Sequence, residues 1–215
     1  MPLNHVVKEG ECISSISFLY GFFPDVIWND PANSKLKNKR KNPNVLFPGD
    51  IVAIPDKRPK EVSCKAQGVL KFKMKGVPAK LRMRFTKDDK PRTSENYKLK
   101  YAGKEISGQT NAEGIIEAWI PPDIQSGILE IGDGKDTKTY YLNFGKLEPV
   151  DTVKGAQTRL RNLGFYDSEI SDRINDKFTE AIKNFQIYFG HPDPSGQLDN
   201  KTAEELVRLH DSRKK

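Results

Sequence analysis

Long apolar runs, cysteine and histidine are scarce in this chain of 215 residues. No stretch approaches the roughly 18 apolar residues of a membrane span, so no transmembrane segment is expected. The first residues carry neither a basic segment nor an apolar stretch, so we expect no signal peptide. Cys12 and Cys64 could form one bridge, but isolated thiols are the favoured interpretation. Without a metal-ligand spacing, no metal and no cofactor are predicted.

The net charge of +7 is spread unevenly. Residues 57–100 carry fifteen basic and four acidic groups, whereas residues 149–215 carry eleven of each. A local excess of this kind can create a binding field. In three strand-like stretches the basic residues alternate with apolar ones, so they share an outward face. This candidate basic patch comprises Lys71, Lys73, Lys75, Lys80, Arg82, Arg84, Lys98 and Lys100. The sequence leaves two interpretations open: these residues form one contiguous binding patch, or they are only a solvated face.

Hydrophobic periodicity divides the chain into three segments. Residues 1–56 have the pattern of strand, helix, helix and strand. Residues 62–148 have a period of two with regular turn signals, which predicts an antiparallel β-sandwich acting as a spacer or interaction domain. Residues 149–211 return to helical spacing and predict three helices. The expected fold class is α+β multidomain, with a βααβ module, an antiparallel β-sandwich and a three-helix bundle.

The N-terminal segment resembles a LysM domain. The matching stretches are Val6-Val7, Gly10-Glu11-Cys12-Ile13, Ile16, Tyr20-Gly21, Ile27-Trp28-Asn29, Asn44-Val45-Leu46-Phe47-Pro48-Gly49-Asp50 and Ile54-Pro55. The resemblance implies a shallow groove, between two loops, that binds chains containing N-acetylglucosamine. The glycan-binding residues that we place there are Gly10, Glu11, Cys12, Ile13, Asn44, Leu46, Pro48 and Gly49. The alternative is that these residues only set turns and pack the small core.

One departure from the LysM pattern is the long connection from Asp30 to Pro43. This form looks like the LysM variant of proteins linked to contractile secretion machines and phage-type tails. The resemblance implies an alternative function, as an adaptor or an accessory of a contractile, type VI-like secretion system or tail baseplate. Its partners would be components of that system or a cognate toxin.

The C-terminal segment resembles the three-helix peptidoglycan-binding domain that often accompanies wall hydrolases. The matching residues are Val153-Lys154-Gly155-Ala156-Gln157, Leu160, Leu163-Gly164-Phe165-Tyr166, Asp172, Thr179, Ala181-Ile182, Phe185-Gln186, Gly196-Gln197-Leu198-Asp199 and Thr202. Where that family usually has glycines, this chain has Arg173 and Asp176-Lys177-Phe178. The loop is therefore bulkier, and a purely structural role for the domain stays open.

No catalytic constellation accompanies these resemblances. The histidines His5, His191 and His210 are scattered, and neither cysteine has a Cys-His context. We therefore expect a non-catalytic protein that binds peptidoglycan. Nucleic acid is an improbable partner, because the aromatics Phe72, Phe85, Tyr97 and Tyr101 fall on the apolar phase. Without a signal peptide, we expect cytoplasmic synthesis with Sec-independent export to the periplasm or a target cell, or protein contacts inside the cell.

Overall fold

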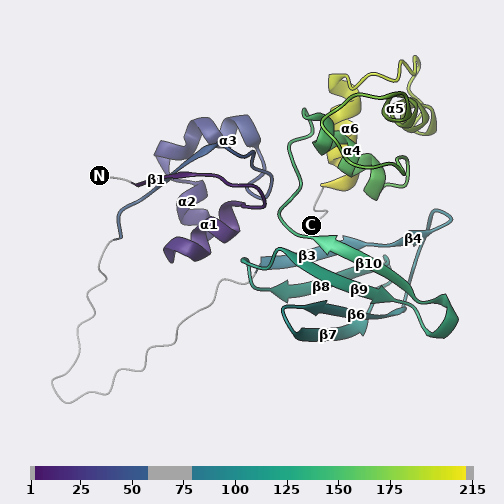
Figure 1. Cartoon of the computed structure of the whole chain (residues 1–215), viewed down its shortest axis with the longest axis horizontal. Coiled ribbons are helices and arrows are strands. Elements are labelled where there is room, and N and C mark those ends of the chain that lie inside the picture. The colour runs from purple at the N-terminus through teal and green to yellow at the C-terminus, as the bar shows by residue number, and fades with distance from the viewer. Residues whose placement is uncertain (1–2, 58–78, 212–215) are drawn as a thin grey trace. The chain divides into compact units, whose positions relative to one another are not determined.

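The computed structural model describes residues 3–57 and 79–211 (Figure 1). By internal packing the chain divides into two units. One contains Met1–Asn44 and Pro48–Lys146, and the other contains Val45–Phe47 and Leu147–Lys215. We describe the N-terminal module, the β-sheet region and the C-terminal helices each by itself. The division tests no predicted domain boundary, so the three domains stay a prediction.

The N-terminal module is a two-stranded antiparallel sheet joined by helices. In chain order its elements are β1 (Leu3–Val6), α1 (Ile13–Tyr20), α2 (Pro24–Trp28), the 3-10 helix η1 (Pro31–Asn33), α3 (Ser34–Arg40) and β2 (Ile51–Ile54). Gly21 ends α1 in a left-handed conformation, φ 73°, and Pro24 opens α2, where a missing N–H costs nothing. Ile13, Ile27 and Val52 are fully buried in this module.

The long connection that departs from the LysM pattern folds into η1 and α3. The Asn33 side chain donates to the carbonyl of Ala53 and accepts from its N–H, both at 2.8 Å. Arg40 donates two hydrogen bonds to the Asp50 carboxylate, at 2.6 and 2.9 Å. Because these buried polar groups are paired, the connection is an integral part of the module.

The β-sheet region contains a four-stranded sheet in the order β10-β9-β6-β7 and a two-stranded sheet, β3-β8, all antiparallel. A short hairpin, β4-β5, completes it. The bounds are β3 (Ala79–Arg84), β4 (Thr86–Lys87), β5 (Lys90–Pro91), β6 (Asn96–Tyr101), β7 (Lys104–Gln109), β8 (Ile115–Ile120), β9 (Ser126–Ile131), the 3-10 helix η2 (Gly134–Asp136) and β10 (Lys138–Asn143). The prediction of antiparallel sheets here is confirmed. The strand residues that the sequence predicts between residues 62 and 78 lie outside the described residues.

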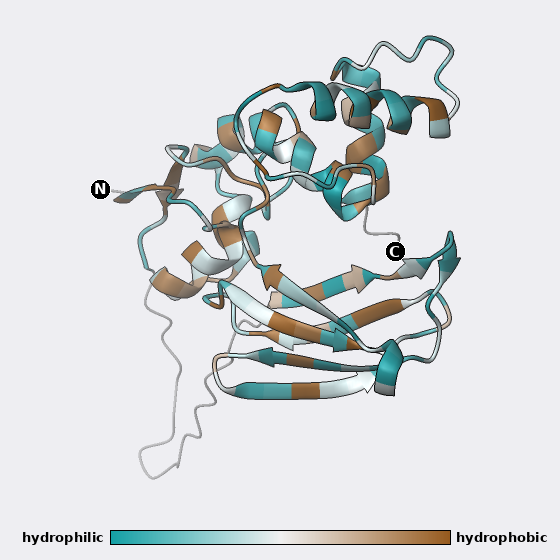
Figure 2. Cartoon of the chain, turned by 45° about the vertical axis from the view of Figure 1, so that its right-hand side comes forward, coloured by the Kyte–Doolittle hydropathy of each residue, from teal (hydrophilic) through white to brown (hydrophobic). Residues whose placement is uncertain are grey.

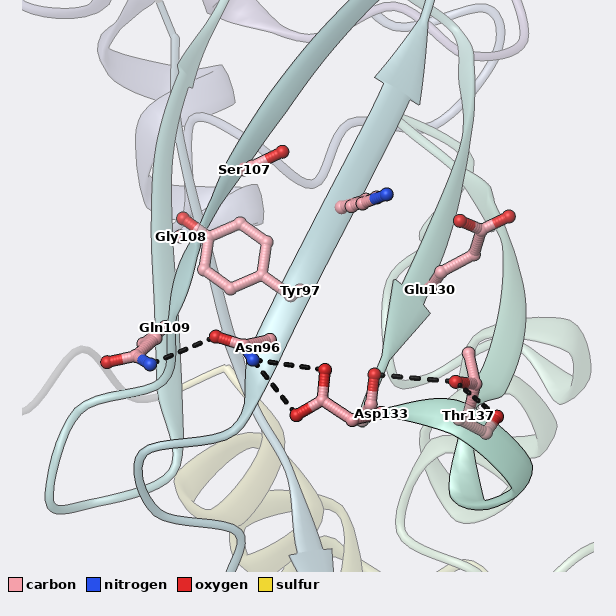
Figure 3. Close-up of a pocket in the computed structure, with 11 residues that line it drawn as sticks. Asn96, Tyr97, Ser107, Gly108, Gln109, Glu130, Asp133 and Thr137 are labelled. Carbon is pink, nitrogen blue, oxygen red and sulfur yellow. Dashed lines mark hydrogen bonds between the residues drawn. The ribbon is translucent and has the colours of Figure 1, made fainter.

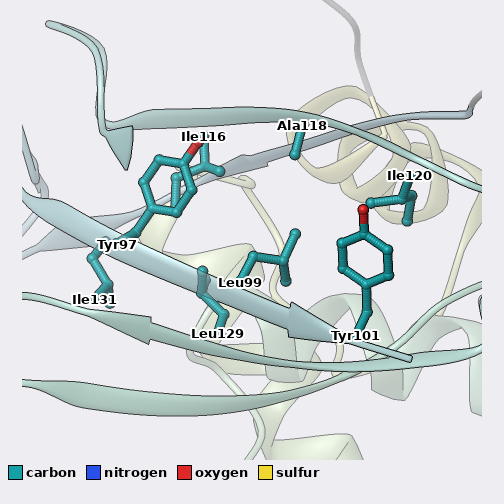
Figure 4. Packing of buried hydrophobic residues seen from close by; sticks show 8 residues of the cluster. All are labelled: Tyr97, Leu99, Tyr101, Ile116, Ala118, Ile120, Leu129 and Ile131. Carbon is teal, nitrogen blue, oxygen red and sulfur yellow. The ribbon is translucent and has the colours of Figure 1, made fainter. Parts of the chain in front are cut away.

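One hydrophobic core joins the two larger sheets (Figure 4). Alternate residues of β6 and β9, including Leu99 and Leu129, face alternate residues of β8, including Ile116, and all three are fully buried. Tyr97 on β6 lies over Gly108 on β7, where a Cβ atom would come within 2.8 Å of the tyrosine hydroxyl. The close packing therefore requires glycine at that position.

Three helices, α4 (Val153–Asn162), α5 (Asp176–Tyr188) and α6 (Asn200–His210), make up the C-terminal region. Each begins with a side-chain cap: Thr152, Asn175 and Asp199 accept a hydrogen bond from a backbone N–H of the first turn. The helices share one core, and their brown apolar stripes alternate with teal polar ones in Figure 2. Within the part of the chain that the structure describes, no helix is long and apolar enough to cross a membrane.

Candidate functional site

Two loops of the N-terminal module, residues 7–12 and 41–50, lie side by side. Backbone hydrogen bonds join them: the N–H of Val7 donates to the carbonyl of Asp50 at 2.9 Å, and that of Gly49 to Val7 at 2.8 Å. The N–H of Ile13 donates to the carbonyl of Pro43 at 2.9 Å. The structure therefore brings together the two loops to which the sequence assigned a glycan groove.

A buried histidine fixes the acidic residue of this candidate site. Nε2 of His5 lies 2.7 Å from a carboxylate oxygen of Glu11, and Nδ1 lies 3.0 Å from the hydroxyl of Tyr20. The same oxygen of Glu11 accepts the N–H of Lys8 at 2.8 Å. Since one oxygen already has two partners, Glu11 organises the loop and leaves its second oxygen to accept further hydrogen bonds.

The predicted glycan-binding residues differ in what they present. Ile13 and Leu46 are 0% and 5% exposed, so neither residue presents a side chain to a ligand, and the N–H of Ile13 is already bonded to Pro43. Gly10 and Gly49 have φ values of 84° and 92°, which favour glycine. The thiol of Cys12 is free and half-buried at the start of α1.

Two further residues complete the set: Pro48 is exposed, and Asn44 is half-buried with its N–H donating to the side chain of Asn42 at 2.9 Å. Pro48 and Gly49 are thus exposed, Gly10 is half-buried, and Ile13 and Leu46 are buried. Whether the eight residues bind a glycan stays a prediction.

The described residues of the predicted basic patch lie on two strands that belong to different sheets. Lys80, Arg82 and Arg84 lie on β3, and Lys98 and Lys100 lie on β6. Since the alternate residues of both strands face the same core, these two sets point to opposite outer faces of the sheets. The predicted members Lys71, Lys73 and Lys75 lie outside the described residues.

Carboxylates of neighbouring strands neutralise part of this charge. Glu117 lies 2.6 Å from Lys80 and 3.3 Å from Arg82, and the hydrogen bond from Lys80 lowers the pKa of Glu117. The hydrogen bond to Glu130, at 3.0 Å, raises the pKa of Lys100. Alternation along single strands could not reveal these pairs, because they depend on which strands become neighbours.

In the C-terminal region two buried glutamines hold the loops that follow α4 and α5. Gln157 accepts the N–H of Ser171 at 2.8 Å and donates to the carbonyl of Arg173 at 3.1 Å. Gln186 accepts the N–H of Gly196 at 2.8 Å and donates to the carbonyl of Gln197 at 3.1 Å. Both glutamines are 0% exposed, and each pairs both ends of its amide with loop backbone; Gln186 also donates to the hydroxyl of Thr202 on α6 at 2.9 Å.

A buried ion pair closes the C-terminal region. Arg159 on α4 donates to Asp211, just after α6, at 2.6 Å, and to the carbonyl of Glu148 at 2.8 Å. Burial alone would raise the pKa of Asp211, but hydrogen bonds from His210 and Arg159 outweigh it and lower that pKa. In a similar pair, Nε2 of His191 lies 2.7 Å from a carboxylate oxygen of Glu205 on α6. These groups stabilise the scaffold beneath the loops.

The bulky loop that departs from the family pattern is therefore well ordered. Gln157 holds Ser171 and Arg173, and Asn175 caps α5 by accepting the N–H of Phe178 at 2.8 Å. Between them Ile174 is 73% exposed. The held loop therefore presents an apolar side chain, Ile174, to solvent.

A polar hollow of about 550 Å³ lies at one end of the four-stranded sheet (Figure 3). Asn96 donates to both oxygens of Asp133, at 3.0 and 2.9 Å, and accepts from Gln109 at 2.9 Å. Sequence analysis missed this cluster, because its members come from three separate strands and turns. Among the described residues no group of three or more His, Cys, Asp or Glu side chains could hold a metal ion.

Comparison with known proteins finds a family match in the C-terminal region. Residues 150–206 match the model of a family described as "Putative peptidoglycan binding domain". The matched segment runs from just before α4 into α6 and includes both glutamine-held loops. No curated protein and no solved structure matches the chain. Peptidoglycan binding is therefore the general function that this segment supports.

Proposed function

We propose that this chain is a non-catalytic protein that binds peptidoglycan through its C-terminal region and its LysM-like N-terminal module. The single observation that carries the proposal is the family match over residues 150–206. The structure adds a physical basis, because the two loops of the matched segment are held by fully buried amides. A rigid loop loses little conformational freedom when a ligand binds.

The N-terminal module contributes a second contact in this proposal. Gly49 in the second loop is exposed, and its C=O can accept a hydrogen bond from the N-acetyl N–H of a sugar, because its own N–H is already bonded to Val7. Two weak sites on one chain would bind a repetitive polymer with higher avidity than either alone.

Co-sedimentation of the full chain with purified sacculi tests this function. We expect Ile174→Ser to reduce the bound fraction, because it removes the exposed apolar side chain of the loop that Gln157 holds. Ile187→Ser, at a residue 56% exposed on α5, is the matched control and should sediment like the wild type. Failure of the wild-type chain to sediment would refute the proposal. Release of muropeptides over time would refute its non-catalytic part.

A second function rests on the helix α3, formed by the long connection. The Asn33 and Arg40 side chains tie that connection to the module, which gives it a fixed surface for a protein partner. The chain would then be an adaptor or accessory of a contractile secretion apparatus. Fractionation of the native host tests this idea: export that is unchanged without a working sheath would exclude it.

A further inference from the structure

An exposed tyrosine marks a second hollow on the outer face of the four-stranded sheet. Tyr141 on β10 is 79% exposed, although its neighbours Tyr140 and Leu142 pack against the core. Strand register places Tyr141 opposite Ile128 on β9, and Ile128 opposite Lys100 on β6. Ile128 is itself 37% exposed. A flat ring and an aliphatic side chain therefore lie next to each other on one face.

Polar groups surround this apolar pair. The hollow has a volume of about 670 Å³ and includes Ser126, Asn143 and Lys104 in its lining. The turn at its rim, Ala102-Gly103, has φ values of 43° and 73°, which suit the tight hairpin between β6 and β7. The site thus combines an aromatic platform with hydrogen-bonding groups at its edge, as small-ligand sites commonly do.

The charges on this outer face balance. Strand register places Glu105 opposite Lys100 and Glu130 opposite Lys98, and Glu130 pairs with Lys100 at 3.0 Å. Lys104 lies opposite the core residue Tyr101, so its side chain starts from the other face of the sheet. Apolar contact and hydrogen bonding therefore decide which ligand fits this face.

We propose that this hollow is a glycan-binding site for a chain of N-acetylated sugars. The C–H face of a sugar ring is apolar and would lie on Tyr141 and Ile128, while Asn143 and Ser126 bind hydroxyl or acetamido groups. This inference rests on the proposed peptidoglycan-binding function and adds a site in a region that the family match does not reach.

The full chain labelled with ¹⁵N, titrated with soluble glycan-peptide strands released from sacculi, tests the site. We expect amide shifts at Ile128, Tyr141 and Asn143, and about tenfold weaker affinity in Tyr141→Ala, the upper range for one aromatic contact. Tyr141→Phe keeps the ring and should stay within about twofold of the wild type.

Trp119→Ala is the matched control. Trp119 is 60% exposed on the two-stranded sheet, opposite Lys80, and so lies on the other outer face of the same core. We expect it to bind like the wild type. The unchanged signals of Leu99 and Leu129 would show that each variant is folded.

Separate outcomes distinguish the site from the general function. Equal affinity of Tyr141→Ala and the wild type, with sacculi still bound, overturns the site alone. Shifts on this face that follow protein dilution instead of added glycan also overturn it, because they indicate contact between copies of the chain. Absence of both sacculus binding and glycan-induced shifts overturns the site and the general function together.

Discussion

The N-terminal module and the C-terminal helices both present loops to solvent, but they hold those loops in different ways. In the N-terminal module, backbone groups of the two loops pair with each other, and glycines adopt the required positive φ. In the C-terminal region, the buried side chains Gln157 and Gln186 reach out from helices to the loops. Loops of the first kind depend mainly on backbone pairing and on glycines, with Glu11 as an added side-chain contact, whereas loops of the second kind depend on a few side chains.

The largest expected effect concerns the buried ion pair of the C-terminal region. Arg159→Ala leaves Asp211 buried without its main partner and should lower the free energy of unfolding by about 3–5 kcal/mol. Arg208→Ala, which removes a side chain 63% exposed beside Glu205, should change it by less than about 1 kcal/mol. Chemical denaturation of both variants measures the difference. Equal effects would mean that burial of the pair is irrelevant.

The buried pair of Arg159 and Asp211 also predicts how the stability of the fold changes with pH. The folded pKa of Asp211 is lowered, so its carboxylate stabilises the fold above the unfolded pKa of about 3.9, and this contribution is lost as pH falls through the folded pKa. We expect Asp211→Asn to be less stable than the wild type at neutral pH and to lose less stability on acidification. Thermal melts from pH 7 down to pH 2 check this. Parallel pH profiles would contradict the assignment.

A smaller effect is expected for the loop-holding amides. Gln186→Leu leaves the N–H of Gly196 without its buried partner and should cost about 1–3 kcal/mol. Faster hydrogen exchange at Gly196 would show that the loop itself has loosened. Gln157→Leu should produce the same change at Ser171 and leave Gly196 protected. Loss of protection at both loops in either variant would show that the two amides do not act separately.

Backbone replacement in the N-terminal module should cost about 1–2 kcal/mol. Gly49→Ala introduces a Cβ at φ 92°, a conformation costly for any other residue, although nothing lies within 4 Å of that Cβ. The cost is therefore conformational, without a steric clash. Gly49→Trp should in addition weaken glycan binding more than any single change in residues 151–215. Thermal denaturation and sacculus sedimentation measure the two effects, and unchanged binding would remove Gly49 from the site.

The smallest effect is expected from salt. Since Glu117 and Glu130 already neutralise several cations of the sheets, exposed charge should contribute little to sacculus binding. Raising the ionic strength from about 0.05 to 0.5 M, which shortens the screening length severalfold, should change the bound fraction by less than about twofold. A steep salt dependence would restore a role for the basic residues.

Sequence periodicity predicted the elements more accurately than the surfaces. It predicted three helices within residues 149–211, and the structure has α4, α5 and α6 there. It also correctly put Tyr97 and Tyr101 in the core. It did not single out Trp119 and Tyr141, which are exposed on the outer faces of the sheets.

Local patterns alone therefore determined the antiparallel strands, the helices and the glycines at turns, since alternation and helical spacing reflect which face of one element is apolar. The tertiary structure decided three further features. It brought loops 7–12 and 41–50 together, placed the lysines of β3 and β6 on opposite faces, and put Tyr141 beside Ile128. Each depends on which elements become neighbours, and that is set by long-range packing that no single stretch of sequence encodes.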